Sequence, residues 1–205
     1  MKVLAEIPTQ AAPAPRAGTL RRCDLEVFHS LLGELDGSRA VLVLGDAPRR
    51  QGVAVGLAAA AAAAGTRTAL LECDLGDPSL AEALGLARAP GLHEYLRGEV
   101  GADCILESLI LAGPGTRAAD EPLVCVVAGR PDPDGSTLLG SERFHQAMAK
   151  LRRAYELLVL DGLPLNGPAA LAAVAAEADA TLACVGHADP RPELGVPVTG
   201  LVVHD

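Results

Sequence analysis

A chain of 205 residues, half of them hydrophobic, is long enough to bury a sizeable core in a single domain. The formal net charge of −9, without a basic patch, argues against a nucleic-acid-binding protein. Phe28, Tyr95, Phe144 and Tyr155 are the aromatic residues and Trp is absent, so the core must be built mainly from Ala, Val and Leu.

The N-terminus and the cysteines are typical of a soluble protein in a reducing compartment. Met1–Pro8 lacks the long apolar run of a signal peptide. The longest apolar stretch, Val53–Ala64, has 12 residues, short of the roughly 20 that span a bilayer. We therefore expect a cytoplasmic protein with no direct membrane insertion. No cysteines have the spacing of a zinc site, and Cys73, Cys125 and Cys184 lie in apolar runs that predict buried thiols.

Helical and strand patterns alternate along most of the chain. Residues 1–18, with three prolines, are predicted to be a flexible N-terminal linker, and residues 19–205 one domain. The predicted helices are Leu20–Leu35, Gln51–Ala64, a helix that starts at Asp77–Ser79, Gly91–Leu96, Gly140–Tyr155 and Ala169–Ala176. The predicted strands are Ala40–Leu44, Thr68–Glu72, Ile105–Leu111, Leu123–Ala128, Leu157–Asp161, Ala180–Val185 and Thr199–Val203. Apolar strands between helices indicate a three-layer α/β/α fold with a mostly parallel central sheet.

The first predicted strand, Ala40–Leu44, runs into a Gly/Pro turn and an alanine-rich helix, which is the layout of a phosphate-binding loop. In a working loop, glycines let backbone N–H groups close on the phosphates, a lysine reaches the β- and γ-phosphates, and a Ser or Thr hydroxyl binds Mg²⁺. Here Arg49, Arg50 and Gln51 occupy the Gly-Lys-Ser/Thr positions. The candidate residues of this degenerate phosphate loop are Pro48, Arg49, Arg50, Gln51 and Gly52. A plain strand-to-helix turn is the alternative.

Two more strand ends carry carboxylates at the sheet edge where ligands of parallel sheets usually bind. Asp74 follows the strand Thr68–Glu72, where a carboxylate can act as a base or hold a metal-bound water. Leu157–Asp161 has the form of a Walker B strand, whose aspartate orients Mg²⁺. Each could instead be a loop carboxylate or a strand cap. Asp74 and Asp161 are therefore the candidate catalytic residues and Mg²⁺ ligands if the protein is active.

Several segments in this order resemble one family. They are Val3–Pro8, Leu25–His29, Thr68–Ser79, Pro90–Gly98, Val126–Gly129, Leu138–Ser141 and Arg153–Pro164. Together they are similar to the cytoplasmic domain of the bacterial tyrosine kinases (BY-kinases) of capsule and exopolysaccharide synthesis, within the MinD/ParA group of P-loop ATPases. The resemblance implies a P-loop NTPase fold, with ATP and Mg²⁺ as the ligands of an active member. It also implies a membrane-embedded polysaccharide co-polymerase, a chain-length regulator, as the partner that would hold the protein at the inner membrane.

The departures from the family pattern concern its chemistry. The phosphate-binding Gly-Lys-Ser/Thr is replaced at Arg49–Gln51, and the C-terminal tyrosine cluster is absent. In the segment that resembles the family's Walker A′ motif, the first aspartate is replaced by Glu72, whereas the second is retained as Asp74. The family's Glu-x-x-Arg-x-x-Arg oligomerisation pattern is here Glu26, His29 and Leu32, so its intersubunit arginines are replaced. Self-association through this helix is left open.

These departures favour a pseudoenzyme that needs no cofactor and acts as a regulatory or interaction component of polysaccharide synthesis and export. Loss of the lysine, the hydroxyl and the loop glycine removes positioning and charge stabilisation, on which phosphoryl transfer mainly depends. The alternative is a residual ATPase or tyrosine kinase, with Arg50 in place of lysine, Asp74 as base and Asp161 on Mg²⁺. A third possibility is a ParA-like positioning protein, against which the acidic charge and the missing lysine count.

Overall fold

The computed structural model describes residues 1–7, 19–20, 26–111, 123–163, 168–187 and 195–204. Its strands are β1 (Val3–Ile7), β2 (Thr19–Leu20), β3 (Ala40–Leu44), β4 (Thr68–Glu72), β5 (Glu107–Leu111), β6 (Leu123–Val126), β7 (Leu157–Asp161), β8 (Ala180–Gly186) and β9 (Gly200–His204). Its α-helices are α1 (Glu26–Glu34), α2 (Ala47–Ala63), α3 (Leu80–Leu84), α4 (Leu92–Arg97), α5 (Glu142–Ala154) and α6 (Pro168–Ala175). Two 3₁₀ turns, η2 (Ala102–Cys104) and η3 (Gly135–Gly140), join them.

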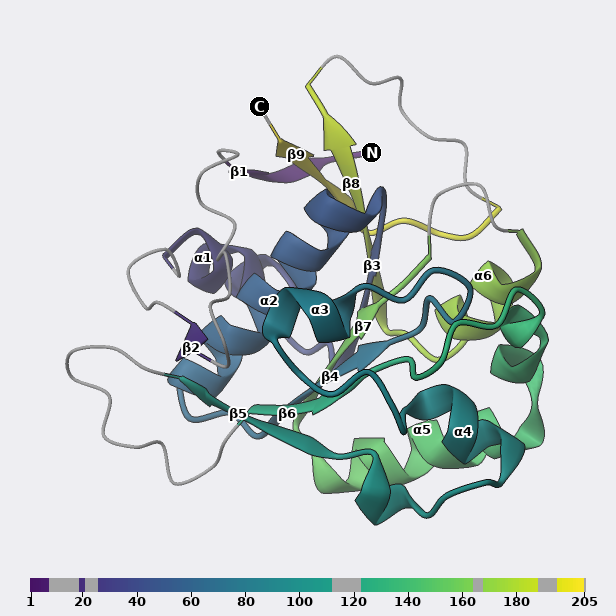
Figure 1. Cartoon of the computed structure of the whole chain (residues 1–205). Coiled ribbons are helices and arrows are strands. Elements are labelled where there is room, and N and C mark those ends of the chain that lie inside the picture. Colours follow the sequence, from purple (N-terminus) through teal and green to yellow (C-terminus); the bar gives the residue numbers. More distant parts are fainter. Residues whose placement is uncertain (8–18, 21–25, 112–122, 164–167, 188–194, 205) are drawn as a thin grey trace.

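Within the described residues the nine strands form one sheet in the order β1-β9-β8-β3-β7-β4-β6-β5-β2 (Figure 1). Neighbouring strands run parallel, except for the antiparallel pair of β5 and β6. The helices α1, α2 and α3 contribute to the core on one face, and α4, α5 and α6 to the core on the other. The predicted three-layer α/β fold is therefore confirmed.

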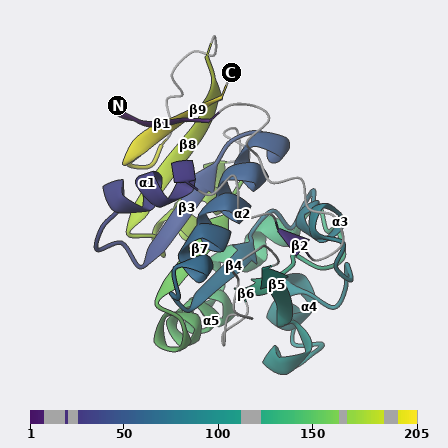
Figure 2. The same ribbon diagram turned by 90° about the vertical axis from the view of Figure 1, so that its left-hand side faces the viewer.

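The alanine-rich helix α2 lies across the sheet beside α1 (Figure 2). Its small side chains let the two helices come close. A Cβ added at Gly56 would lie 2.3 Å from the ring of the fully buried Phe28, a contact too short to be accommodated without movement. The core of Ala, Val and Leu that the composition predicted is thus accompanied by close packing between these two helices.

The predicted linker is wrong for its first part. Val3–Ile7 forms β1, which pairs in parallel with β9 and buries Ile7 almost completely. The burial along this strand shows no regular alternation, because only its last residue is fully covered, and this explains why the sequence pattern missed it. Residues 8–18 lie outside the described part of the chain. The first predicted helix also begins later, at Glu26, since Thr19–Leu20 pairs as a strand with β5.

Three predicted buried cysteines, Cys73, Cys125 and Cys184, are buried as expected, while Cys104 is exposed. Burial raises the pKa of the thiols of Cys73 and Cys184, so both stay protonated and unreactive. Among the described residues, no helix combines the length and apolar character that crossing a membrane requires.

Candidate functional site

The candidate site lies where three neighbouring strands end. β7 lies between β3 and β4, and its last residue, Asp161, pairs in register with Val43 on one side and Glu72 on the other. The backbone N–H of Cys73 then donates to the carbonyl of Asp161 at 2.8 Å, which holds Asp74 beside this end of β7. The predicted convergence of the strand ends is therefore confirmed.

The segment predicted to be a phosphate loop is helical. Only Gly45 and Asp46 separate β3 from α2, and the N–H of Arg50 already donates to the carbonyl of Asp46 at 3.0 Å. Pro48 occupies the first turn of α2, where its fixed backbone angle suits a helix and its missing N–H is not needed. Helix α2 thus begins before its predicted start at Gln51, so the expectation that Pro48, Arg49 and Arg50 lie in a loop is wrong. From Arg50 onward the N–H groups enter the helix instead of a phosphate cradle.

The side chain of Arg50 fills the space between the two candidate carboxylates. It is fully buried. Its Nε donates to Asp161 Oδ1 at 2.7 Å and its Nη2 to Asp74 Oδ2 at 3.3 Å. Its Nη1 donates to the carbonyl of Gly45 at 3.4 Å. One guanidinium thus links the ends of β3, β4 and β7.

The ion pairs of Arg50 decide the charges of this cluster. Burial by itself favours neutral side chains, but the carboxylates of Asp161 and Asp74 outweigh it and raise the pKa of Arg50, so the guanidinium stays charged. Burial raises the pKa of Asp161 to about 7, although the nearby Arg50 opposes this shift. The second oxygen of Asp161, Oδ2, is buried and has no hydrogen-bond partner among the described residues.

Glu72 is a structural residue of the site that sequence reasoning did not identify. Its fully buried carboxylate accepts hydrogen bonds from the N–H groups of Ser79 and Leu80, both at 2.7 Å, and of Ala128 at 2.8 Å. It therefore fixes the start of α3 to the end of β6. Beside it, Gln51 Nε2 donates to Ser79 Oγ at 2.5 Å. The sequence signal for this role was the glutamate itself, in the position where the similar family has an aspartate. Its side chain is one methylene longer than that of aspartate and contacts backbone N–H groups on two other segments.

This arrangement does not fit a Mg²⁺–nucleotide complex. The two carboxylates that the family resemblance assigns to Mg²⁺ are already ion-paired with Arg50, and a helix takes the place of the phosphate cradle. In the part of the chain that the structure describes, no group of three or more His, Cys, Asp or Glu side chains is arranged to hold a metal ion. In the cluster of Arg50, Asp74 and Asp161, one buried cation can hold the ends of β3, β4 and β7 together.

The raised pKa of Asp161 gives a testable pH dependence. Between an ordinary value of 3.8 and about 7 the folded chain binds more protons than the unfolded chain, so ionisation of Asp161 lowers stability as pH rises. Asp161→Asn cannot ionise. Urea titration gives the free energy of unfolding of this variant and of wild type. We expect the difference, variant minus wild type, to increase by up to about 1.4 kcal/mol per pH unit as the pH rises through this window.

A matched control is Asp179→Asn. Although Asp179 is partly desolvated, Arg152 and backbone N–H groups lower its pKa, so its ionised form stabilises the fold. The stability of Asp179→Asn relative to wild type should therefore worsen as the pH rises through the acidic range. Identical pH trends for the two variants would contradict the assignment of a raised pKa to Asp161.

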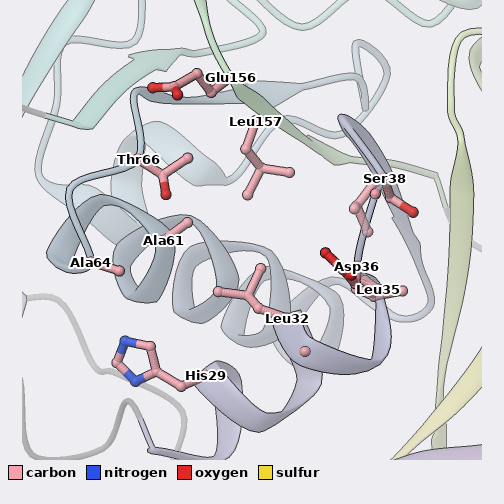
Figure 3. Close-up of a pocket in the computed structure, with 13 residues that line it drawn as sticks. His29, Leu32, Leu35, Asp36, Ser38, Ala61, Ala64, Thr66, Glu156 and Leu157 are labelled. Carbon is pink, nitrogen blue, oxygen red and sulfur yellow. The ribbon is translucent and has the colours of Figure 1, made fainter.

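Another hollow lies at the opposite edge of the sheet. A cavity of about 370 Å³ opens beside the amino ends of β3 and β7, between α1 and the end of α2 (Figure 3). His29 and Leu32 of α1 border it, with Asp36 and Glu156 across from them. Glu156 is already paired with Arg67. Because this hollow is at the other end of the strands, it is separate from the Arg50 cluster.

Comparison with known proteins agrees with this fold. No protein-family model and no curated protein matches the chain. Among solved structures, the chimeric protein CapA2B2 superposes with a TM-score of 0.80 at 18% identity, over 100% of this chain and 94% of that one. The kinase domain of the Escherichia coli tyrosine kinase ETK gives 0.79 at 16%, over 100% and 90%. The septum site-determining protein MinD of Pyrococcus horikoshii, complexed with Mg-ADP, gives 0.59 at 14%, over 82% of each chain. The chain therefore has the P-loop NTPase-like fold that bacterial tyrosine kinase domains share with MinD-type ATPases.

Proposed function

We propose that this chain is a non-catalytic, BY-kinase-like domain that acts as a regulatory or interaction component of capsular or exopolysaccharide synthesis and export. The observation that carries the proposal is the buried guanidinium of Arg50, which bridges Asp161 and Asp74. The pathway is the one that the sequence resemblance implies, and the similarity in fold to the tyrosine kinase domains of ETK and BceF supports it.

Two physical reasons support the loss of activity. Phosphoryl transfer depends on cations and N–H groups placed around the phosphates, and removal of even one such donor costs about 10²–10³ in rate. Here the N–H groups belong to the first turns of α2, and the cation at this position points to the carboxylates. Binding of Mg²⁺–ATP would first have to displace Arg50 from two ion pairs, leaving its charge buried without partners.

The proposed partner is the one that the family resemblance implies, a membrane-embedded polysaccharide co-polymerase. Such a partner would place a cytoplasmic domain at the inner membrane. A domain that contacts a partner without turning over ATP needs a stable fold independent of nucleotide, and the Arg50 bridge provides charge compensation at the strand ends without a ligand. Self-association is compatible with this role.

Binding of a fluorescent ATP analogue tests the proposal. We expect no saturable, Mg²⁺-dependent binding to this chain, and no tyrosine phosphorylation on incubation with ATP. The kinase domain of the E. coli tyrosine kinase ETK, measured in parallel, is the positive control. Micromolar binding that requires Mg²⁺ and is lost in Asp161→Asn would overturn the proposal in favour of a residual ATPase or kinase.

A further inference from the structure

A partly open apolar slot lies on the face of the sheet covered by α4 and α5, away from the Arg50 cluster. It has a volume of about 190 Å³ and is walled by side chains that include Leu92, Ile105, Ala147 and Leu151. Apart from Lys150 and two tyrosines, the side chains that line it are apolar. Leu106, one of the few large apolar side chains exposed in the described chain, belongs to the same lining.

Both tyrosines of the chain lie at this slot. The sequence contains two tyrosines and no tryptophan, and both tyrosines, Tyr95 and Tyr155, border the slot. Tyr95 is almost fully buried, and the guanidinium of Arg143 lies over its ring, with Cζ 4.9 Å from the ring centre. Tyrosine rings offer a flat apolar wall together with a hydroxyl, a combination suited to a ligand with an apolar body and a polar end.

Among the described residues that line the slot, the one charged side chain is positive. Lys150 lines it, is exposed, and forms no ion pair within the described residues. Arg143 is seven positions earlier on α5 and, in the same described part, contacts the ring of Tyr95 without a carboxylate partner. Acidic residues adjoin the lining residues in sequence, but none of them lines the slot; they are Glu72, Glu94, Asp103, Glu107 and Glu156. Glu94 and Glu156 are paired with Arg130 and Arg67. Two uncompensated cations on one helix face therefore adjoin an apolar slot.

We infer that this slot binds a small amphipathic anion, in which a compact apolar group carries one carboxylate or phosphate that pairs with Lys150. A cavity of about 150 Å³ accepts a benzene ring, so the slot suits a single ring or a chain of about six to eight carbons. Lys150 contributes the charge, and its alkyl stem completes the apolar wall. The site shares no residue with the Arg50 cluster and does not depend on the function proposed above.

Tyrosine fluorescence provides a direct assay, because the chain has no tryptophan and both tyrosines border the slot. The probes are octanoate, octyl phosphate and octylammonium, each kept below its micelle-forming concentration. We expect a saturable change in emission with octanoate, octyl phosphate or both. The affinity for octylammonium should be lower than that for the preferred anion by at least about tenfold. The two anions distinguish a carboxylate site from a phosphate site.

Matched variants of α5 separate the slot from general surface charge. Lys150→Gln should weaken binding of the preferred anion by about tenfold. Arg153→Gln, which also removes one positive charge but at an exposed position that does not line the slot, should leave binding unchanged. Ala147→Leu should abolish binding by filling the cavity. Equal binding of octylammonium, equal losses in the two charge variants, or no saturable change with either anion would overturn the inference.

Discussion

Arg50→Ala is expected to lower the free energy of unfolding by about 3–5 kcal/mol, the usual result of removing one partner from a buried ion pair. The guanidinium is fully buried and is the cation that faces both Asp161 and Asp74. Without it the carboxylate of Asp161 is left buried and either carries an uncompensated charge or takes up a proton. The loss should therefore be larger at pH 8 than at pH 5, and urea unfolding followed by far-UV circular dichroism measures it at both.

Arg49→Ala is the matched control. The neighbouring arginine is partly exposed, and its contact with Asp46 spans 4.0 Å, so its removal should cost no more than about 1 kcal/mol. Arg50→Lys should lie between the two alanine variants, because an ammonium keeps the charge but cannot reach both carboxylates in the fork geometry of a guanidinium. Equal losses for the two alanine variants would show that Arg50 does not hold the strand ends together.

A double-mutant cycle separates lost charge pairing from lost packing. In the Arg50→Ala background, Asp161→Asn removes the carboxylate that has lost its partner. The second change should therefore recover part of the stability, with a coupling energy of about 1–3 kcal/mol. Strict additivity of the two single changes would mean that Arg50 acts through its bulk and not through its charge.

The sequence predicted the sheet well because its central strands are continuous apolar runs between helices. Thr68–Glu72 and Leu157–Asp161 were predicted with the bounds that the structure has. The convergence of Asp74 and Asp161 followed from the geometry of parallel strands, which places their carboxyl ends at one edge. Local pattern and tertiary structure agree at these positions, so simple rules were sufficient.

The candidate phosphate segment was predicted less well because tertiary interactions decide its structure. Two adjacent arginines in a sequence give no indication that one is buried and the other partly exposed. The buried one, Arg50, is fixed by carboxylates 24 and 111 positions away along the chain. Glu72 was missed for the same reason, because its three N–H partners lie on two other elements. In both cases a residue that departs from the pattern of the similar family makes a structural contact.

Glu72→Ala is the second change with a large expected effect. It leaves the N–H groups of Ser79, Leu80 and Ala128 without the carboxylate that accepts all three. Each unsatisfied buried donor costs about 1–3 kcal/mol, so we expect a total loss of about 4 kcal/mol or more in urea unfolding. Faster amide hydrogen exchange at Leu80 and Ala128 should accompany it, because the start of α3 is no longer attached to the end of β6.

Two further variants sharpen this test. Glu72→Gln keeps the oxygen that faces α3 but presents an amide N–H₂ group to the N–H of Ala128, so its loss should be intermediate. Glu82→Ala, on α3 itself, removes a glutamate side chain that is 82% exposed and should change stability by less than about 0.5 kcal/mol. A loss in Glu72→Ala as small as that of Glu82→Ala would contradict the structural role. The expected ranking would instead mean that the side chain at this position, like that of Arg50, stabilises the fold by joining elements that are far apart in the sequence.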